Sequence, residues 1–244
     1  MKVAHFRFYA ELNDFLPPSR RFVAFRESFE VRGSVKDMIE SLGVPHTEVD
    51  LILANGESVD FSYLVQEGDR ISVYPVFECI DITPVLRVRP RPLRQTRFVL
   101  DAHLGRLANY LRMLGFDALY RNDYRDEELA RLSCDQERIL LTRDRNLLKR
   151  RAVQHGYCLR ETRPRRQLLE VLERFDLSGS MGAFTRCLRC NGLLEAVSKE
   201  VVADRLPPQT REHYQEFHQC ASCGQVYWKG SHYRRMRQFI ESLG

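Results

Sequence analysis

Short hydrophobic runs alternate with polar turns over the first 80 residues, and one helical stretch lies among them. VAHFRFYA and RRFVAFRESF have the alternation of paired strands, and VDLILANG and DRISVYPVF predict two more. Between these pairs, four apolar side chains recur at helical spacing: Val35, Met38, Ile39 and Leu42. Ser34 is placed to cap this helix and Gly43 to end it. The order β-β-α-β-β predicts a β-grasp domain over residues 1–82.

Strand and helix patterns alternate in the next part of the chain. RFVLD, DALY, RILLT and GYCLRE predict short strands, and LGRLANYLRMLG, DEELARLSCD, DRNLLKRRAVQHG and PRRQLLEVLERF predict the helices between and after them. This alternation is typical of βαβ crossovers and a parallel sheet, which we assign to residues 97–178. Residues 179–244 add the strand-like LLEAV and a last helix. The predicted fold class is a multidomain α+β and α/β protein.

A basic, proline-rich segment separates the first two domains. PVLRVRPRPLRQTR, at residues 84–97, holds three prolines and five arginines with no acidic residue, which predicts an extended linker at 83–96. Residues 1–83 carry 8 Lys/Arg against 14 Asp/Glu, so the remainder carries 30 (38 − 8) against 19 (33 − 14). This asymmetry is consistent with a polyanionic partner for the second part, or with an ordinary solvated basic surface.

The composition is that of a globular protein outside the membrane. With 43% hydrophobic residues, the chain has no apolar run near the roughly 20 residues that span a bilayer, and no signal-peptide core begins it. We therefore expect a cytoplasmic protein with no membrane partner. The seven cysteines are an odd number, and disulfides are rare in the cytoplasm, so we do not expect a disulfide framework. Cys79, Cys134 and Cys158 are predicted to be small packing residues.

The other four cysteines form the pattern CxxC–x₂₉–CxxC. They are Cys187 and Cys190 in CLRCNG, and Cys220 and Cys223 in CASCGQVYW. Two such turns can enclose one tetrahedral Zn²⁺, and four thiolates leave no open position, so one structural Zn²⁺ per chain is predicted. Redox use of the pairs is the alternative. The segment predicts a zinc ribbon.

Carboxylates follow two strands of the predicted parallel sheet. RFVLD ends in Asp101 and RILLTRD in Asp144, while NDYRDEEL offers Asp123, Asp126 and Glu127 at a helix entry. The carboxyl ends of parallel strands meet at one edge, where carboxylates can hold Mg²⁺ or Mn²⁺ for phosphoryl chemistry. The alternative is helix capping, which Asp favours and which is compatible with metal binding.

Three segments carry a family resemblance. FVLDAHLGRLANYLRMLGFD, NDYRDEELARL and RILLTRDRNLL are similar in order and spacing to the Mut-seven C-terminal RNase family, a branch of the PIN-like ribonucleases in which a zinc ribbon follows the core. The resemblance implies that Asp101, Asp126 and Asp144 are catalytic and bind Mg²⁺ or Mn²⁺. It makes Asp123, Glu127 and Asn146 candidates for accessory contacts.

The N-terminal domain has a resemblance of its own. SVKDMIESLGVP, LILANGESV and EGDRISVYPVF resemble the ubiquitin-like domain related to sulfur carriers. A sulfur carrier activates a free C-terminal Gly-Gly, whereas here PVFECIDITP continues the chain. We therefore expect a scaffolding or protein-binding module, with a protein partner that the sequence does not identify.

Several cations and one aromatic residue are candidates for RNA contact. Arginines on the predicted α/β domain and a mixed aromatic and basic tail supply them: Arg112, Arg143, Arg145, Trp228, Arg234 and Arg235. For the tail, the alternative is a ribbon strand followed by a helix that docks through Met236, Phe239, Ile240 and Leu243. The predicted function is a metal-dependent ribonuclease, and the alternative is a non-catalytic RNA-binding adaptor.

Overall fold

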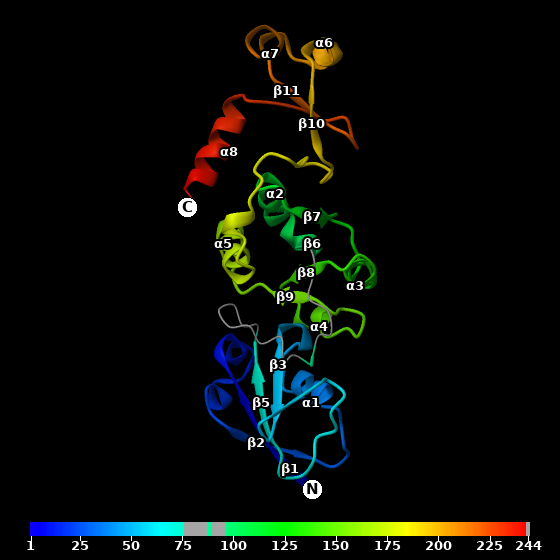
Figure 1. Cartoon of the computed structure of the whole chain (residues 1–244), viewed down its shortest axis with the longest axis vertical. Helices are drawn as coiled ribbons and strands as arrows, with labels where there is room; N and C mark the ends of the chain where they lie inside the picture. The colour runs from blue at the N-terminus through cyan, green and yellow to red at the C-terminus, as the bar shows by residue number, and fades with distance from the viewer. Residues whose placement is uncertain (76–86, 89–95, 243–244) are drawn as a thin grey trace. The chain divides into compact units, whose positions relative to one another are not determined.

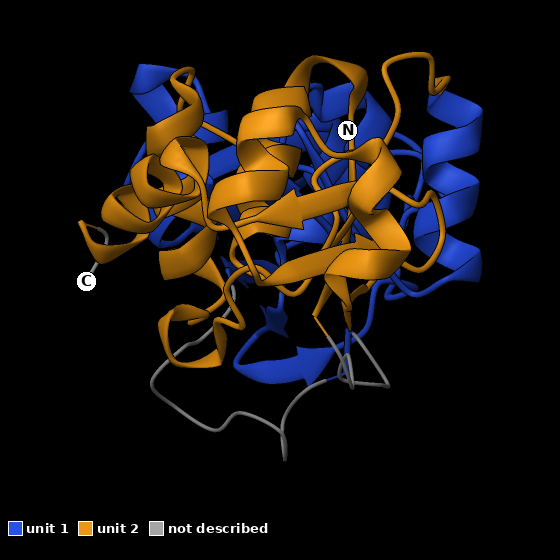
Figure 2. Ribbon diagram, turned by 90° about the horizontal axis from the view of Figure 1, so that it is seen from above, with its two compact units in different colours: residues 1–95, 126–158 blue, residues 96–125, 159–244 orange. Residues whose placement is uncertain are grey.

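The computed structural model describes residues 1–75, 87–88 and 96–242. Cys79 and nearly all of the predicted linker lie outside the described residues. The chain divides into two compact units: unit 1 joins residues 1–95 with 126–158, and unit 2 joins 96–125 with 159–244 (Figure 2). Unit 1 therefore contains residues 126–158 of the predicted α/β domain together with the N-terminal residues. The domain boundaries given by the sequence are still predictions.

Unit 1 begins with a mixed five-stranded sheet. Its elements in chain order are β1 (Lys2–Phe8), η1 (Ala10–Phe15), η2 (Pro18–Arg20), β2 (Phe25–Phe29), α1 (Val35–Ser41), η3 (His46–Glu48), β3 (Leu51–Ala54), β4 (Glu57–Val59) and β5 (Arg70–Tyr74) (Figure 1). The strand order is β2-β1-β5-β3-β4, with β1 and β5 parallel and the other pairs antiparallel. Fully buried Phe6, Ile39, Ile52 and Val73 form part of its core. This is the predicted β-grasp fold.

Local chemistry explains where these elements begin and end. The Ser34 hydroxyl accepts a hydrogen bond from the Asp37 N–H at 3.1 Å, and Gly43 takes a φ of 102°, as the cap predictions require. The second strand begins at Phe25 rather than Arg20, because Asn13 Oδ1 accepts from the Phe22 N–H at 2.7 Å and holds the preceding loop. The short strand β4 was not predicted.

The second part of unit 1 has one element that is shorter than predicted. Its elements are α3 (Asp126–Asp135), β8 (Ile139–Thr142), α4 (Arg145–Leu148) and β9 (Gly156–Cys158), with β8 and β9 parallel. The predicted helix over DRNLLKRRAVQHG is a single turn. Tertiary contacts override helix propensity here, because the β-grasp domain binds the irregular residues 149–155 and the strand β9 that follows them.

Buried polar groups of the β-grasp domain contact residues 149–158. Glu48, which is fully buried, accepts a hydrogen bond from the Cys158 N–H. The His46 ring lies between Glu40 Oε1 at 2.6 Å and the Val153 carbonyl at 2.8 Å. Lys149 donates to the Glu40 carbonyl at 2.7 Å. The β-grasp domain and residues 126–158 are therefore one packed body, which supports the predicted scaffolding role.

These contacts predict a stability effect. We expect Glu48→Ala to lower the free energy of unfolding by about 3 kcal/mol, because it leaves the buried Cys158 N–H without this acceptor and opens a cavity. Urea denaturation followed by circular dichroism would measure the change. The control is Glu57→Ala on exposed β4, which we expect to stay within about 0.5 kcal/mol of the parent. Equal effects of the two substitutions would contradict a specific role for Glu48.

Unit 2 contains the remaining elements. They are β6 (Arg97–Leu100), η5 (Ala102–Leu104), α2 (Gly105–Met113), β7 (Asp117–Tyr120), α5 (Pro164–Arg174), η6 (Ser178–Ser180), β10 (Leu194–Val197), α6 (Lys199–Val202), η7 (Ala203–Arg205), α7 (Pro208–His213), β11 (Phe217–Cys220), β12 (Val226–Trp228) and α8 (Ser231–Glu241). Strands β6 and β7 are parallel, as predicted, and α2 packs on both β7 and α5. Gly115 ends α2 with a φ of 93°, where a Cβ would lie 2.2 Å from the Gly182 carbonyl oxygen.

The end of unit 2 is a three-stranded antiparallel sheet in the order β10-β11-β12. Its core is small: Val202, Leu206, Phe217 and Val226. The helices α6 and α7 between its strands were not predicted. In α8, the Phe239 ring lies 5.0 Å from that of Tyr110, which confirms that this helix docks through Phe239. Leu243 lies outside the described residues.

Candidate metal sites

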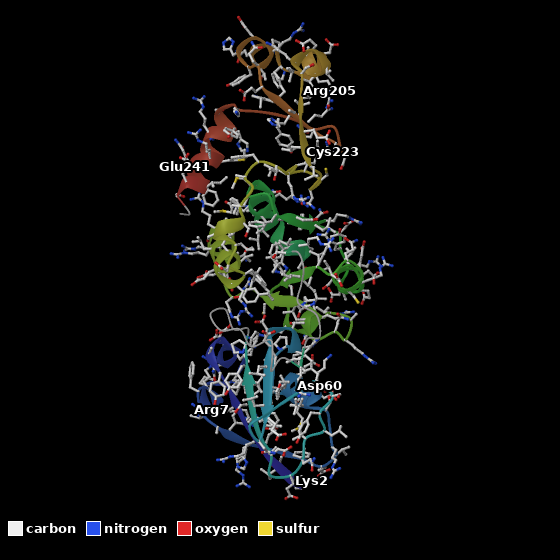
Figure 3. All side chains as sticks on the ribbon, viewed as in Figure 1. Lys2, Arg7, Asp60, Arg205, Cys223 and Glu241 are labelled. Atoms are coloured by element: carbon white, nitrogen blue, oxygen red, sulfur yellow. The ribbon has the colours of Figure 1, made fainter. Side chains whose placement is uncertain are left out.

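Four cysteine side chains converge in unit 2, in the region where Figure 3 labels Cys223. Their sulfur atoms all lie within 4.8 Å of one another, with 3.6 Å between Cys187 and Cys223 and 3.4 Å between Cys190 and Cys220. Thiolates bound to tetrahedral Zn²⁺ at 2.3 Å would be about 3.8 Å apart. At Gly192 a Cβ would lie 2.9 Å from the Cys220 sulfur, so the turn needs glycine. The tetrad fits one Zn²⁺, and His218 is outside it.

The electrostatics around Cys187 favour a thiolate. Burial raises its pKa, but hydrogen bonds from the Tyr227 hydroxyl, from the Cys190 and Arg189 N–H groups and from Cys223 outweigh this and lower the pKa to about 7. The Tyr227 oxygen is 3.2 Å from the Cys187 sulfur. Burial, with neighbouring thiols, raises the pKa of Cys190 to about 12. A metal cation among the four sulfurs would offset the free-energy cost of ionising Cys190.

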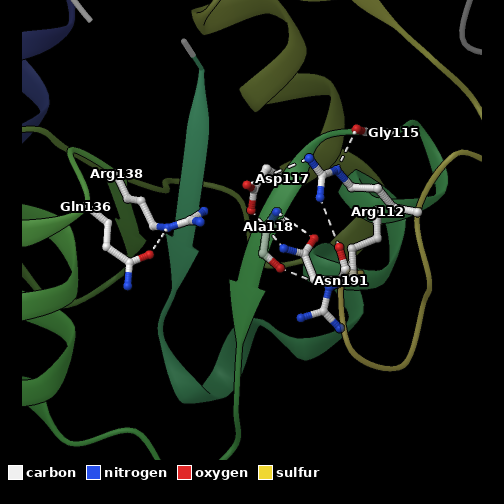
Figure 4. Close-up of polar contacts among 8 residues, drawn as sticks. Arg112, Gly115, Asp117, Ala118, Gln136, Arg138 and Asn191 are labelled. Atoms are coloured by element: carbon white, nitrogen blue, oxygen red, sulfur yellow. Dashed lines mark hydrogen bonds and ion pairs between the residues drawn. The ribbon is translucent and has the colours of Figure 1, made fainter. Parts of the chain in front are cut away.

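Buried polar contacts fix the first cysteine turn to α2 and β7. Arg112, only 3% exposed, donates from Nε to the Ala118 carbonyl at 2.9 Å and from Nη1 to the Leu188 carbonyl at 2.9 Å. Asn191 accepts from the Ala118 N–H at 3.0 Å and donates to Asp117 at 2.7 Å (Figure 4). Desolvation lowers the pKa of Arg112. Its guanidinium thus binds carbonyls in the interior, and an RNA contact of Arg112 stays a prediction.

The two strand-end aspartates both cap the helical turn that follows. Asp101 Oδ1 accepts from the Ala102 N–H at 2.6 Å, and Asp144 Oδ1 accepts from the Asn146 N–H at 2.8 Å. Asp101 also lies 3.3 Å from the His103 ring. The capping alternative is therefore confirmed for both. It is compatible with metal binding, because an ionised carboxylate has about four lone-pair positions.

The carboxylates near the start of α3 contact arginines. Arg150 donates to Asp126 at 3.3 Å and to Glu127 at 3.0 Å, and the hydrogen bond to Glu127 raises the Arg150 pKa. Arg121 donates twice to Asp123 at 2.9 Å and lowers the pKa of that carboxyl. Asp123 and Glu127 are exposed. No sequence spacing pointed to Arg150, since it is 24 residues from Asp126.

The proposed catalytic carboxylates belong to different units. Asp101 lies in unit 2, while Asp126 and Asp144 lie in unit 1. Among the described ranges, the cysteine tetrad is the one group of three or more His, Cys, Asp or Glu side chains that could hold a metal ion. The meeting of Asp101, Asp126 and Asp144 around a divalent ion therefore stays a prediction.

The other RNA candidates occupy varied settings. Arg145 lies over the Phe15 ring, 4.8 Å from its centre, so its nearest partner is the β-grasp domain. Trp228 packs against the ribbon core. Arg143, Arg234 and Arg235 are exposed, and Asn146 is exposed beside Asp144. Sequence analysis did not single out Asn191 and Tyr227, whose roles depend on partners at least 39 residues away.

These features define a class of protein: a ubiquitin-like β-grasp domain, an α/β domain with parallel strands, and a C-terminal ribbon with a four-cysteine metal site. Residues 96–240 match the family model described as Mut7-C RNAse domain, and residues 1–81 match the one described as Mut7-C ubiquitin. Because the first match covers more than half of the chain, the protein belongs to the Mut7-C RNAse domain family. No curated protein and no solved structure matches it. Within the described residues, none of the helices has the length and hydropathy to cross a bilayer.

Proposed function

We propose that the protein is a metal-dependent ribonuclease that hydrolyses RNA phosphodiesters. The observation that carries this proposal is the match of residues 96–240 to the RNase family model. The basic balance of the chain after residue 83 agrees with an RNA substrate. Six free cysteines among the described residues are in keeping with a reducing compartment, and we propose the cytoplasm.

In this proposal Asp101, Asp126 and Asp144 hold one or two Mg²⁺ or Mn²⁺ ions. Such ions supply an activated water and charge neutralisation at the phosphodiester. The cap bonds of Asp101 and Asp144 hold each carboxylate in a fixed rotamer at the end of its strand. Glu127, Asp123 and Asn146 are accessory candidates, and Arg150 would keep Asp126 oriented through its hydrogen bond.

A cleavage assay tests the proposal. We expect the intact, zinc-loaded chain to shorten a labelled RNA when Mg²⁺ or Mn²⁺ is added, and to leave it whole in the same buffer without them. Omission of the ion is preferable to a chelator, because a chelator would also strip zinc from the tetrad. No metal-dependent product with any of several RNAs would exclude the nuclease.

The second candidate is a non-catalytic RNA-binding adaptor. The basic surface favours it equally, since phosphate binding needs no catalytic ion. The adaptor would bind RNA in a salt-sensitive manner and give no product when Mg²⁺ or Mn²⁺ is added. For the β-grasp domain we keep the proposal of a protein partner, and the surface away from Glu48 and His46 is the part that such a partner would use.

A further inference from the structure

Unit 2 has two neighbouring hollows, and the first is lined by the residues that come directly after Asp101 in the chain. The first, of about 650 Å³, is lined by residues that follow Asp101 directly, Ala102 to Leu107, and by residues of α5 and the first cysteine turn. The second, of about 530 Å³, is lined by the start of α5, by Tyr110 and by Phe239 of α8. Arg106 and Pro164 line both, so the hollows are neighbours. We call them together the arginine groove.

We propose that the arginine groove binds the phosphate backbone of single-stranded RNA and leads it to Asp101. The inference deepens the proposed function and rests on it, because it takes RNA as the substrate. Besides the buried Arg112, five more arginines line the groove: Arg106, Arg163, Arg165, Arg166 and Arg189. All five are exposed, and no Asp or Glu lines either hollow. Among the described residues, none of the five forms an ion pair with a carboxylate.

The helix ends in the groove add to this positive potential. The helix α5, of 11 residues, has Arg163 as its N-cap and no acidic residue in its first turn. The helix α2, of 9 residues, also has no acid there and carries Arg106 as its second residue. Cations at a helix N-terminus are unfavourable to the isolated helix, since the dipole favours anions. A bound phosphate would relieve the repulsion at both helix ends.

The aromatic residues of the groove indicate how RNA would be recognised. The Phe239 ring already contacts Tyr110, and the Arg165 guanidinium lies 4.8 Å from its centre. Tyr120 donates its hydroxyl to the Ala102 carbonyl at 2.8 Å in the first hollow. These rings are engaged within the protein, so the groove offers charge rather than stacking platforms. Binding by charge alone makes the groove tolerant of RNA sequence.

The test is the salt dependence of binding. The probe is a labelled uridine oligonucleotide of about 12 nucleotides, in buffer without divalent ions so that cleavage plays no part. Log affinity falls with log salt by about 0.7 per phosphate contact on a single strand. We expect the triple variant Arg106→Gln/Arg163→Gln/Arg166→Gln to reduce this slope by about 2 and to bind more weakly at low salt. Arg165 is kept because it packs on Phe239.

The control makes the same change of charge elsewhere. Arg32→Gln/Lys199→Gln/Arg211→Gln alters cations outside both hollows, and we expect it to keep the parent slope. A groove variant that is folded by circular dichroism and keeps the parent slope and affinity would overturn the proposal. So would equal competition by a polyglutamate peptide of the same charge, which would assign the groove to acidic proteins.

The cleavage assay separates this inference from the proposed function. If the parent cleaves RNA and the groove variant cleaves and binds as the parent does, the groove assignment is wrong and the nuclease stands. If the groove variant loses RNA binding while the parent gives no metal-dependent product, the groove stands and the chain is an adaptor.

Discussion

Asp101→Asn and Asp144→Asn are each expected to reduce metal-dependent RNA cleavage by about a thousandfold. An amide keeps the size of the side chain and can still accept the cap hydrogen bond through its oxygen. It lacks the negative charge that a Mg²⁺ or Mn²⁺ ligand supplies, and a carboxylate-bound ion contributes several kcal/mol to the transition state. A loss of about 4 kcal/mol corresponds to that factor. The measurement is the initial rate of cleavage of a labelled RNA at saturating metal.

The control for these variants is Asp135→Asn, which makes the same exchange at the exposed end of α3. We expect it to cleave at the parent rate. Thermal melting of all three proteins separates loss of chemistry from loss of fold, since the cap bonds of Asp101 and Asp144 contribute to stability. Parent-like cleavage by both folded asparagine variants would rule out these carboxylates as metal ligands.

Some parts of the candidate sites could be predicted from the sequence and others could not, because some depend on neighbouring residues and others on residues far along the chain. The tetrad at Cys187, Cys190, Cys220 and Cys223 is local chemistry, because two residues between thiols place both on one turn whatever the rest of the chain does. The caps at Ser34 and Gly43 are local in the same way. The setting of Arg112 could not be predicted, because two of its partners are the carbonyls of a turn 76 and 77 residues further along the chain. No periodicity of the helix that carries it reveals such a partner.

The helix after Asp144 illustrates the same limit in the fold. DRNLLKRRAVQHG has the composition of a longer helix, yet α4 ends at Leu148. The cause lies about 100 residues earlier, where the Glu40 carbonyl accepts from Lys149 and His46 contacts the Val153 carbonyl. Propensity describes a segment in isolation, and here buried polar contacts from another domain decide its path. The same contacts make the β-grasp domain a structural support for the segment that carries Asp144.

Cys190→Ser/Cys223→Ser is expected to remove the zinc and unfold the ribbon. Together the two exchanges take one ligand from each CxxC pair, and the two remaining thiolates cannot close a tetrahedral site. Without the ion, the ribbon depends on Val202, Leu206, Phe217 and Val226, which is too small a core to fold alone. Structural zinc contributes on the order of 10 kcal/mol to folding in comparable small sites. Metal analysis should change from about one zinc per chain to none.

Loss of the zinc should also destabilise α2, because Arg112 of this helix donates to the Leu188 and Arg189 carbonyls of the first cysteine turn. We therefore expect faster hydrogen exchange in β10–β12 and at the C-terminal end of α2, with unit 1 unchanged. Cys134→Ser on α3, outside the tetrad, should keep both the zinc and the protection. A variant that lost zinc but kept a protected ribbon would show that the ion is not structural. Retention of one zinc per chain would show that the tetrad does not bind it.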